Sequence, residues 1–142
     1  MLQRRPPRLI RRLLVVEDEP LVAFDNEYFL EQEGYDVVAT VDTVDAALDL
    51  LGRESVDAVL LDVNLAGDRS GVEVAVAARA SEIPVLFLSG SIPPDAAELA
   101  MAALTKPYAH RELAAALKVM DAIVAGRPPE KWPDSMRLFA AI

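Results

Sequence analysis

The sequence predicts an α/β domain built on a doubly wound, five-stranded parallel sheet. Apolar runs of strand length recur along the 142 residues, they alternate with helical patterns, and they are apolar at nearly every position. Continuous apolar runs are typical of strands that are covered on both faces of a parallel sheet. The alternation of strand and helix requires right-handed crossovers, which place helices on both faces.

Five strands are predicted at the apolar runs 13–16, 37–41, 56–61, 84–88 and, more weakly, 102–105. The first helix is predicted at 20–33, because Pro20 suits a helix start and Gly34 suits the position just after a helix end. Its inward stripe contains Asn26, which needs a polar partner if it is buried. The last helix is predicted at 109–125, where apolar residues recur at helical spacing.

Two further helices have candidate N-caps. Thr43 is predicted to cap the second helix and Ser70 the third, because a hydroxyl can accept a hydrogen bond from a free N–H of the first turn. Pro93 and Pro94 leave room for only about two turns of a fourth helix, from 95 to about 101. The apolar stripe of the first helix is formed by Val22, Phe29 and Leu30, and that of the second by Ala46, Ala47, Leu50 and Leu51. The stripe of the third helix is formed by Val72, Val76 and Ala80, and that of the last by Leu113, Leu117, Met120 and Val124.

Composition excludes several kinds of site. The chain has no Cys, so disulfides, thiolate metal sites and cysteine nucleophiles are excluded. The one histidine, His110, rules out a multi-histidine metal site and is predicted to lie at the surface in the first turn of the last helix. No apolar run approaches the about 20 residues that a transmembrane helix needs.

The net charge of −9 is unevenly distributed. Five of the 14 basic residues lie within residues 4–12, and the remaining nine face 23 acidic residues. Such an acidic body repels nucleic-acid phosphates. The basic N-terminal arm, residues 1–11, is predicted to be a frayed terminus. The strand-like run 13–16 and then acidic residues follow the arginines, and not a signal-peptide apolar region, so a cytoplasmic location is expected.

Polar side chains follow four of the predicted strands. Glu17 and Asp18 follow the first strand, Asp62 the third, Ser89 the fourth and Lys106 the fifth. Because ligands of such sheets bind beyond the carboxyl ends of the strands, these side chains are expected to meet at one edge.

The converging groups have a defined chemistry. Three carboxylates at one edge favour a hard divalent cation, and Mg²⁺ binds in this way through one or two carboxylates together with a phosphate. Lys106 can pair with Asp62 or with a phosphate oxygen, and Ser89 can donate a hydrogen bond to another. A carboxylate in these surroundings is a plausible phosphoryl acceptor, because its neighbours neutralise the charge that arrives.

Four short stretches of the sequence are similar to a known family. The stretches VVEDEP, VLLDVNL, FLSG and LTKPY resemble the receiver domain of two-component response regulators, over roughly residues 12–125. The resemblance implies a flavodoxin-like (βα)5 receiver fold, in which Pro93 and Pro94 would leave this chain with a shortened fourth helix. It also implies a cis peptide bond at Lys106–Pro107, where proline lowers its cost.

The resemblance assigns a role to each matching position. Asp62 would be the phosphoacceptor that forms an aspartyl phosphate, Ser89 the switch hydroxyl, and Lys106 the lysine that contacts the phosphoryl group. Mg²⁺, or Mn²⁺ in its place, would be held by Glu17, Asp18, Asp62 and the backbone carbonyl of Asn64.

Two features depart from the family pattern. The aromatic switch residue expected three positions before the lysine is Ala103 here, so the usual coupling of a hydroxyl shift to an aromatic rotamer is in doubt. The segment 89–106 is also short for a loop, a helix and a strand together. Family members commonly signal through that face, so this chain is expected to signal differently.

The predicted organisation is a basic arm at 1–11, a receiver domain at 12–126 and a Pro-containing tail at 127–142, with no DNA-binding domain. The tail carries Trp132, Met136, Leu138 and Phe139, which are predicted to dock on the protein's own surface. A homodimer is left open.

The predicted function is that of a single-domain response regulator, not an enzyme acting on other substrates. It would accept a phosphoryl group from a sensor histidine kinase or a histidine phosphotransfer protein, and then switch the binding of an unknown downstream protein or act as a phosphate shuttle or sink in a phosphorelay.

Two alternatives remain. One is a Mg²⁺-dependent phosphohydrolase with an aspartyl nucleophile, which needs an acid at position 64, where Asn64 cannot transfer a proton. The other is a degenerate receiver that acts only as an interaction module, an idea that Ala103 keeps open.

Overall fold

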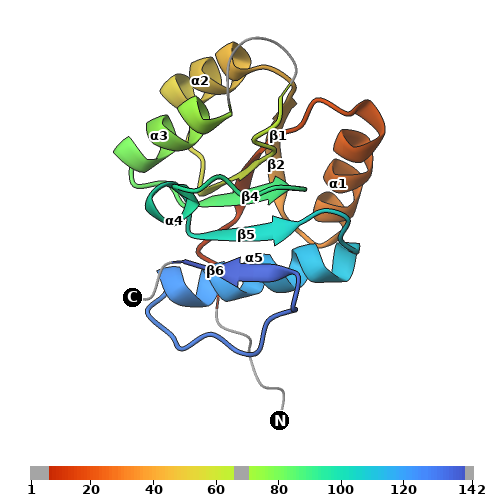
Figure 1. Ribbon diagram of the computed structural model, residues 1–142, viewed down its shortest axis with the longest axis vertical. Coiled ribbons are helices and arrows are strands. Elements are labelled where there is room, and N and C mark those ends of the chain that lie inside the picture. Colours follow the sequence, from red (N-terminus) through yellow and green to blue (C-terminus); the bar gives the residue numbers. More distant parts are fainter. Residues whose placement is uncertain (1–6, 66–70, 140–142) are drawn as a thin grey trace.

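A computed structural model describes residues 7–65 and 71–139, which form an α/β structure around one sheet. Its strands lie in the order β2-β1-β3-β4-β5-β6 (Figure 1). The first five are parallel, and β6 is antiparallel to β5. The doubly wound fold is thus confirmed, but the described sheet has six strands where five were predicted. The strands are β1 (Arg12–Val16), β2 (Asp36–Val41), β3 (Ala58–Leu61), β4 (Val85–Ser89), β5 (Ala102–Thr105) and β6 (Met136–Leu138).

Two apolar clusters cover the two faces of the sheet. Helices α1 and α5 pack on one face, and α2, α3 and α4 pack on the other (Figure 1). The central strands β3 and β4 are buried along their whole length, as their continuous apolar sequences predict. No helix in the described part of the chain has the length and apolar character that spanning a bilayer requires. The helices are α1 (Pro20–Gln32), α2 (Val44–Arg53), α3 (Val72–Ala80), α4 (Ala96–Leu99) and α5 (His110–Val124).

The predicted helix starts agree with the structure in part. The Thr43 hydroxyl accepts a hydrogen bond from the Ala46 N–H at 3.1 Å, so this cap is confirmed. Ser70 lies outside the described residues.

The predicted stripe of α3 is wrong: Val76 is 51% exposed, whereas Val74, Ala75 and Ala78 are buried. Nearly every residue of α3 is apolar, so polarity alone does not select its inner face.

The C-terminal tail supplies the additional strand. Leu104 of β5 pairs with Met136, and the Thr105 N–H donates to the Ser135 carbonyl at 2.9 Å. Met136 is buried in the cluster beneath α5, and Phe139 packs against the cluster on the opposite face. Docking of the tail on the protein's own surface is therefore confirmed for these residues, whereas Trp132 remains 37% exposed.

The N-terminal arm is also partly attached to the body. The backbone N–H groups of Leu9 and Ile10 both donate to the buried Asp121 carboxylate at 2.8 Å. Asp57 accepts in the same way from the backbone of Arg11. The predicted frayed terminus is thus wrong for residues 9–11, because two carboxylates on the body satisfy their donors.

Candidate functional site

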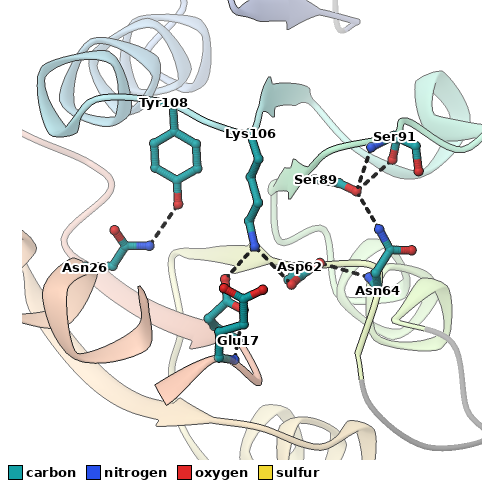
Figure 2. Close-up of polar contacts among 9 residues, drawn as sticks. Glu17, Asn26, Asp62, Asn64, Ser89, Ser91, Lys106 and Tyr108 are labelled. Atoms are coloured by element: carbon teal, nitrogen blue, oxygen red, sulfur yellow. Dashed lines mark hydrogen bonds and ion pairs between the residues drawn. The ribbon is translucent and has the colours of Figure 1, made fainter. Parts of the chain in front are cut away.

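The carboxyl ends of four parallel strands place the predicted polar residues at one edge of the sheet (Figure 2). Glu17 follows β1, Asp62 follows β3, Ser89 ends β4 and Lys106 follows β5. Glu17, Asp62 and Ser89 are all buried. Backbone contacts fix the first two, since the Glu17 N–H donates to the Val41 carbonyl and the Asp62 N–H to the Val16 carbonyl, each at 2.9 Å.

Lys106 joins two of the carboxylates. Its Nζ donates to Glu17 Oε1 at 2.9 Å and to Asp62 Oδ2 at 3.1 Å (Figure 2). Burial of the ammonium by itself would lower the pKa of Lys106, but the hydrogen bonds to Glu17 and Asp62 outweigh burial, so this pKa lies above its ordinary value. Lys106 is therefore a fixed positive charge beside Asp62.

Burial dominates the environment of Glu17. Desolvation of its carboxylate raises the pKa of Glu17, while the hydrogen bonds from Lys106 and from the Glu19 N–H act in the opposite direction. The folded protein thus holds a carboxylate here at a cost in free energy, which a further positive charge at the site would reduce.

Asp62 is held from both sides of its carboxylate. While Lys106 occupies Oδ2, the backbone N–H of Asn64 donates to Oδ1 at 2.9 Å. Gly71 lies directly behind this turn: a Cβ there would be 2.9 Å from the Asp62 carbonyl oxygen. Only glycine fits this close approach. The sequence did not indicate this requirement, because the position of Gly71 before α3 gives no sign of it.

Ser89 is linked to Asp62 through Asn64. Its hydroxyl donates to the Ser91 carbonyl at 2.7 Å and accepts from the Asn64 side-chain amide at 3.0 Å (Figure 2). It also accepts from the Ser91 N–H at 3.2 Å. The hydroxyl therefore fixes the start of the segment that leads to α4.

Three carboxylates are close enough to hold a metal ion. Oxygen atoms of Glu17, Asp18 and Asp62 lie within 4.8 Å of one another. An all-oxygen set of this kind suits Mg²⁺ or another hard divalent cation. The Asn64 carbonyl, the fourth predicted ligand, belongs to the turn that carries Asp62, and its part in metal binding stays a prediction.

A second polar pair that sequence reasoning missed lies beside Lys106. The buried Asn26 of α1 donates from Nδ2 to the Tyr108 hydroxyl at 2.9 Å (Figure 2). The sequence required a partner for Asn26 but did not identify Tyr108, which is 82 positions away. Both residues line an open cleft of about 500 Å³, together with Lys106 and the exposed His110. The peptide bond Lys106–Pro107 is cis, as expected.

Comparison with known proteins agrees with this geometry. The model of the response regulator receiver domain matches residues 13–118, most of the chain. The chain belongs to the response regulator receiver family. Strand β6 and the end of α5 lie beyond the matched part of this receiver.

Solved receiver structures are similar to it. The solution structure of SdrG from Sphingomonas melonis Fr1 is 38% identical, with a TM-score of 0.66 over 76% of this chain and 93% of that one. PhyR from Brucella abortus is 32% identical, with a TM-score of 0.61 over 72% of this chain but only 44% of PhyR. A CheY-like receiver from Methanospirillum hungatei JF-1, 22% identical, shares the fold with a TM-score of 0.73 over 82% of this chain and 98% of that one.

Proposed function

We propose that the protein is a response regulator whose receiver domain accepts a phosphoryl group on Asp62 in a Mg²⁺-dependent reaction. The donor would be a sensor histidine kinase or a histidine phosphotransfer protein. The observation that carries this proposal is the placement of Asp62, a buried carboxylate that is joined to Glu17 through Lys106. Phosphorylation would switch the binding of a downstream protein, or the receiver would act as a phosphate shuttle or sink.

The side chains suit an in-line transfer. An oxygen of Asp62 forms the new O–P bond while the P–N bond to the donor imidazole breaks. The imidazole keeps the electron pair of that bond and, being protonated on its other nitrogen, leaves as a neutral ring. The Asn64 N–H holds the carboxylate in place. Lys106, already 3.1 Å from Asp62, places a positive charge beside the oxygens that arrive, and Ser89 supplies a hydroxyl that can turn toward them.

The residues present fit a divalent metal. Oxygens of three carboxylates lie within 4.8 Å of one another, Lys106 bonds to two of these groups, and burial raises the pKa of one of the two, Glu17. Glu17, Asp18, Asp62 and the Asn64 carbonyl would hold Mg²⁺, or Mn²⁺ in its place. When bound, the ion supplies positive charge for the phosphoryl oxygens.

The cleft beside Lys106 gives a protein donor access to the site. It opens between the start of α1 and the start of α5 and has an apolar wall that includes Val22 and Tyr108. The binding of a histidine-bearing partner over this cleft would bring its phosphoimidazole to Asp62.

The alternative functions have less support. Position 64, where an aspartyl-nucleophile phosphohydrolase needs a general acid, holds an amide that donates to Ser89. A degenerate receiver has no need for the complete set of acceptor, lysine and acidic cluster, although Ala103 departs from the family pattern.

The proposal is tested by intact-mass measurement after incubation with acetyl phosphate. The wild type should gain one phosphoryl group with Mg²⁺ and none with EDTA. Asp62→Asn, which keeps nearly the same shape but removes the nucleophilic carboxylate, should gain none. Labelling of Asp62→Asn at the wild-type level would place the acceptor elsewhere. A folded wild type that takes no phosphoryl group from acetyl phosphate or from any histidine kinase of the same organism would support the degenerate receiver.

A further inference from the structure

Helix α1 exposes an apolar stripe on the side that faces away from the sheet. Leu21, Phe24 and Tyr28 are 80%, 66% and 62% exposed. Their spacing of three and four positions places them on one face of the helix, opposite the buried Asn26 and Leu30. The exposed acids Asp25 and Glu31 flank the stripe on its two sides. Such a cluster of large apolar side chains on an otherwise acidic helix marks a contact surface.

A groove with the complementary chemistry borders the same helix, which contributes Phe29 to its lining. It has a volume of about 690 Å³ and runs between α1, α5 and the chain that follows α5. Phe29, Ala115 and Ala122 contribute apolar surface to it, and Arg111, Lys118 and Lys131 contribute positive charge. An apolar helix face with acidic flanks would find both apolar contact and opposite charge here.

The positive charge of the groove stands out in a chain with a net charge of −9. No salt bridge within residues 7–65 and 71–139 engages Arg111, Lys118 or Lys131. The acids Glu33 and Glu130 also line the groove, while Asp121 is buried and already accepts from Leu9 and Ile10. Basic residues thus outnumber the exposed acids at this groove, the reverse of the chain as a whole.

We propose that two copies of this chain associate through their α1/α5 faces. The two helices are neighbours on one side of the sheet, where Phe29 of α1 stacks on His110 of α5 with ring centroids 4.5 Å apart. A two-fold axis across this face therefore brings the α1 stripe of each copy to the groove of the other. The contact is isologous, because each copy contributes one acidic apolar stripe and one basic groove.

The first experiment measures mass against concentration for the full chain, by sedimentation equilibrium without phosphodonor. The weight-average mass should rise from 15.4 kDa toward twice that value as the concentration increases. Phe24→Glu should raise the dimer dissociation constant at least about tenfold, because it places a charge at the centre of the apolar contact. A dissociation constant of about 1 mM corresponds to very weak association. A wild type that stays monomeric up to this concentration would overturn the proposal.

A charge exchange tests the interface itself. In Arg111→Glu/Lys118→Glu both the stripe and the groove are acidic, and in Asp25→Lys/Glu31→Lys both are basic. In a two-fold dimer of either double variant alone, both contacts between a stripe and a groove join like charges, so each variant alone should be monomeric. An equimolar mixture meets opposite charge at both contacts and should form a heterodimer, which weakens as salt is added.

Matched controls separate this interface from general attraction between oppositely charged proteins. Arg53→Glu/Arg79→Glu makes the same charge change on α2 and α3, the opposite side of the sheet, and should leave the wild-type dimer unchanged. Adding Phe24→Glu to both partners of the mixture should abolish the heterodimer. A dimer that is indifferent to Phe24→Glu and to both reversals, or a mixture that gains nothing, would place the contact elsewhere. Melting curves of each variant confirm that it is folded.

Discussion

At the scale of single residues, Glu17 is held in its ionised form against an unfavourable environment. Replacing it by Gln removes the buried charge and leaves Lys106 paired with Asp62. We therefore expect Glu17→Gln in EDTA to be more stable than the wild type by about 1–2 kcal/mol. The thermal midpoint should rise by about 3–6 °C, measured at neutral pH by circular dichroism. The same variant should lose most of the stabilisation that Mg²⁺ gives to the wild type.

The pH dependence of this gain has a definite sign. Because burial raises the pKa of Glu17 above its ordinary value of 4.5, the folded state binds this proton more tightly than the unfolded state. Ionisation of Glu17 therefore lowers stability as the pH rises from about 4.5 through the raised pKa. The advantage of Glu17→Gln should be absent at lower pH and should grow as the pH rises through this raised pKa. An advantage that is equal at pH 4 and pH 7 would show that charge is not its cause.

Lys106→Met is the matched contrast to Glu17→Gln. It leaves Glu17 and Asp62 together without their shared ammonium, so it should lower stability by about 2–3 kcal/mol at neutral pH. The part of Lys106 that remains in contact with solvent, 23% of its side chain, keeps this loss below that of a fully buried pair. If both variants changed stability in the same direction, the central role of Lys106 in the charge balance would be wrong.

At the scale of elements, strand β6 closes the edge of the sheet that β5 would otherwise expose. Met136 is 4% exposed and packs in the cluster beneath α5, whereas Arg137 next to it is exposed. Met136→Asp should therefore destabilise the protein by about 2–4 kcal/mol in urea unfolding, because it buries an unpaired charge and removes apolar contacts. Arg137→Gln should change stability by less than about 0.5 kcal/mol. Equal effects of the two substitutions would mean that β6 is not packed in solution.

The elements also differ in how well the sequence predicted them. The five parallel strands were predictable because each contains an apolar run, the weakest of them in β5, and their carboxyl ends then brought Asp62 and Lys106 to one edge. Strand β6 has only three residues and exists through its pairing with Ala102–Leu104, more than thirty positions earlier, so no local pattern indicated it. The Asn26–Tyr108 bond and the close approach of Gly71 likewise depend on the packing of distant segments.

At the scale of the whole molecule, the question is how a change at Asp62 reaches the surface. Ala103 in β5 carries no ring that could move inward behind Ser89. The Ser89 hydroxyl instead holds both the carbonyl and the N–H of Ser91, at the start of the loop that leads to the four-residue helix α4. If the hydroxyl turns toward a phosphoryl group, it gives up these contacts and releases the start of the loop that leads to α4.

We therefore expect beryllofluoride with Mg²⁺, a mimic of the acyl phosphate, to change hydrogen exchange most in residues 89–101. A smaller change is expected in β6, because the Thr105 N–H next to Lys106 donates to the Ser135 carbonyl and Ser135 donates to Glu112 of α5. Ser89→Ala should exchange rapidly at Ser91 even without beryllofluoride and respond less to it, and Asp62→Asn should not respond. The Ser89 hydroxyl bonds to Asn64 and Ser91 and not to α5. A response confined to residues 113–124 of α5, with residues 89–101 unchanged, would therefore mean that the signal does not pass through Ser89.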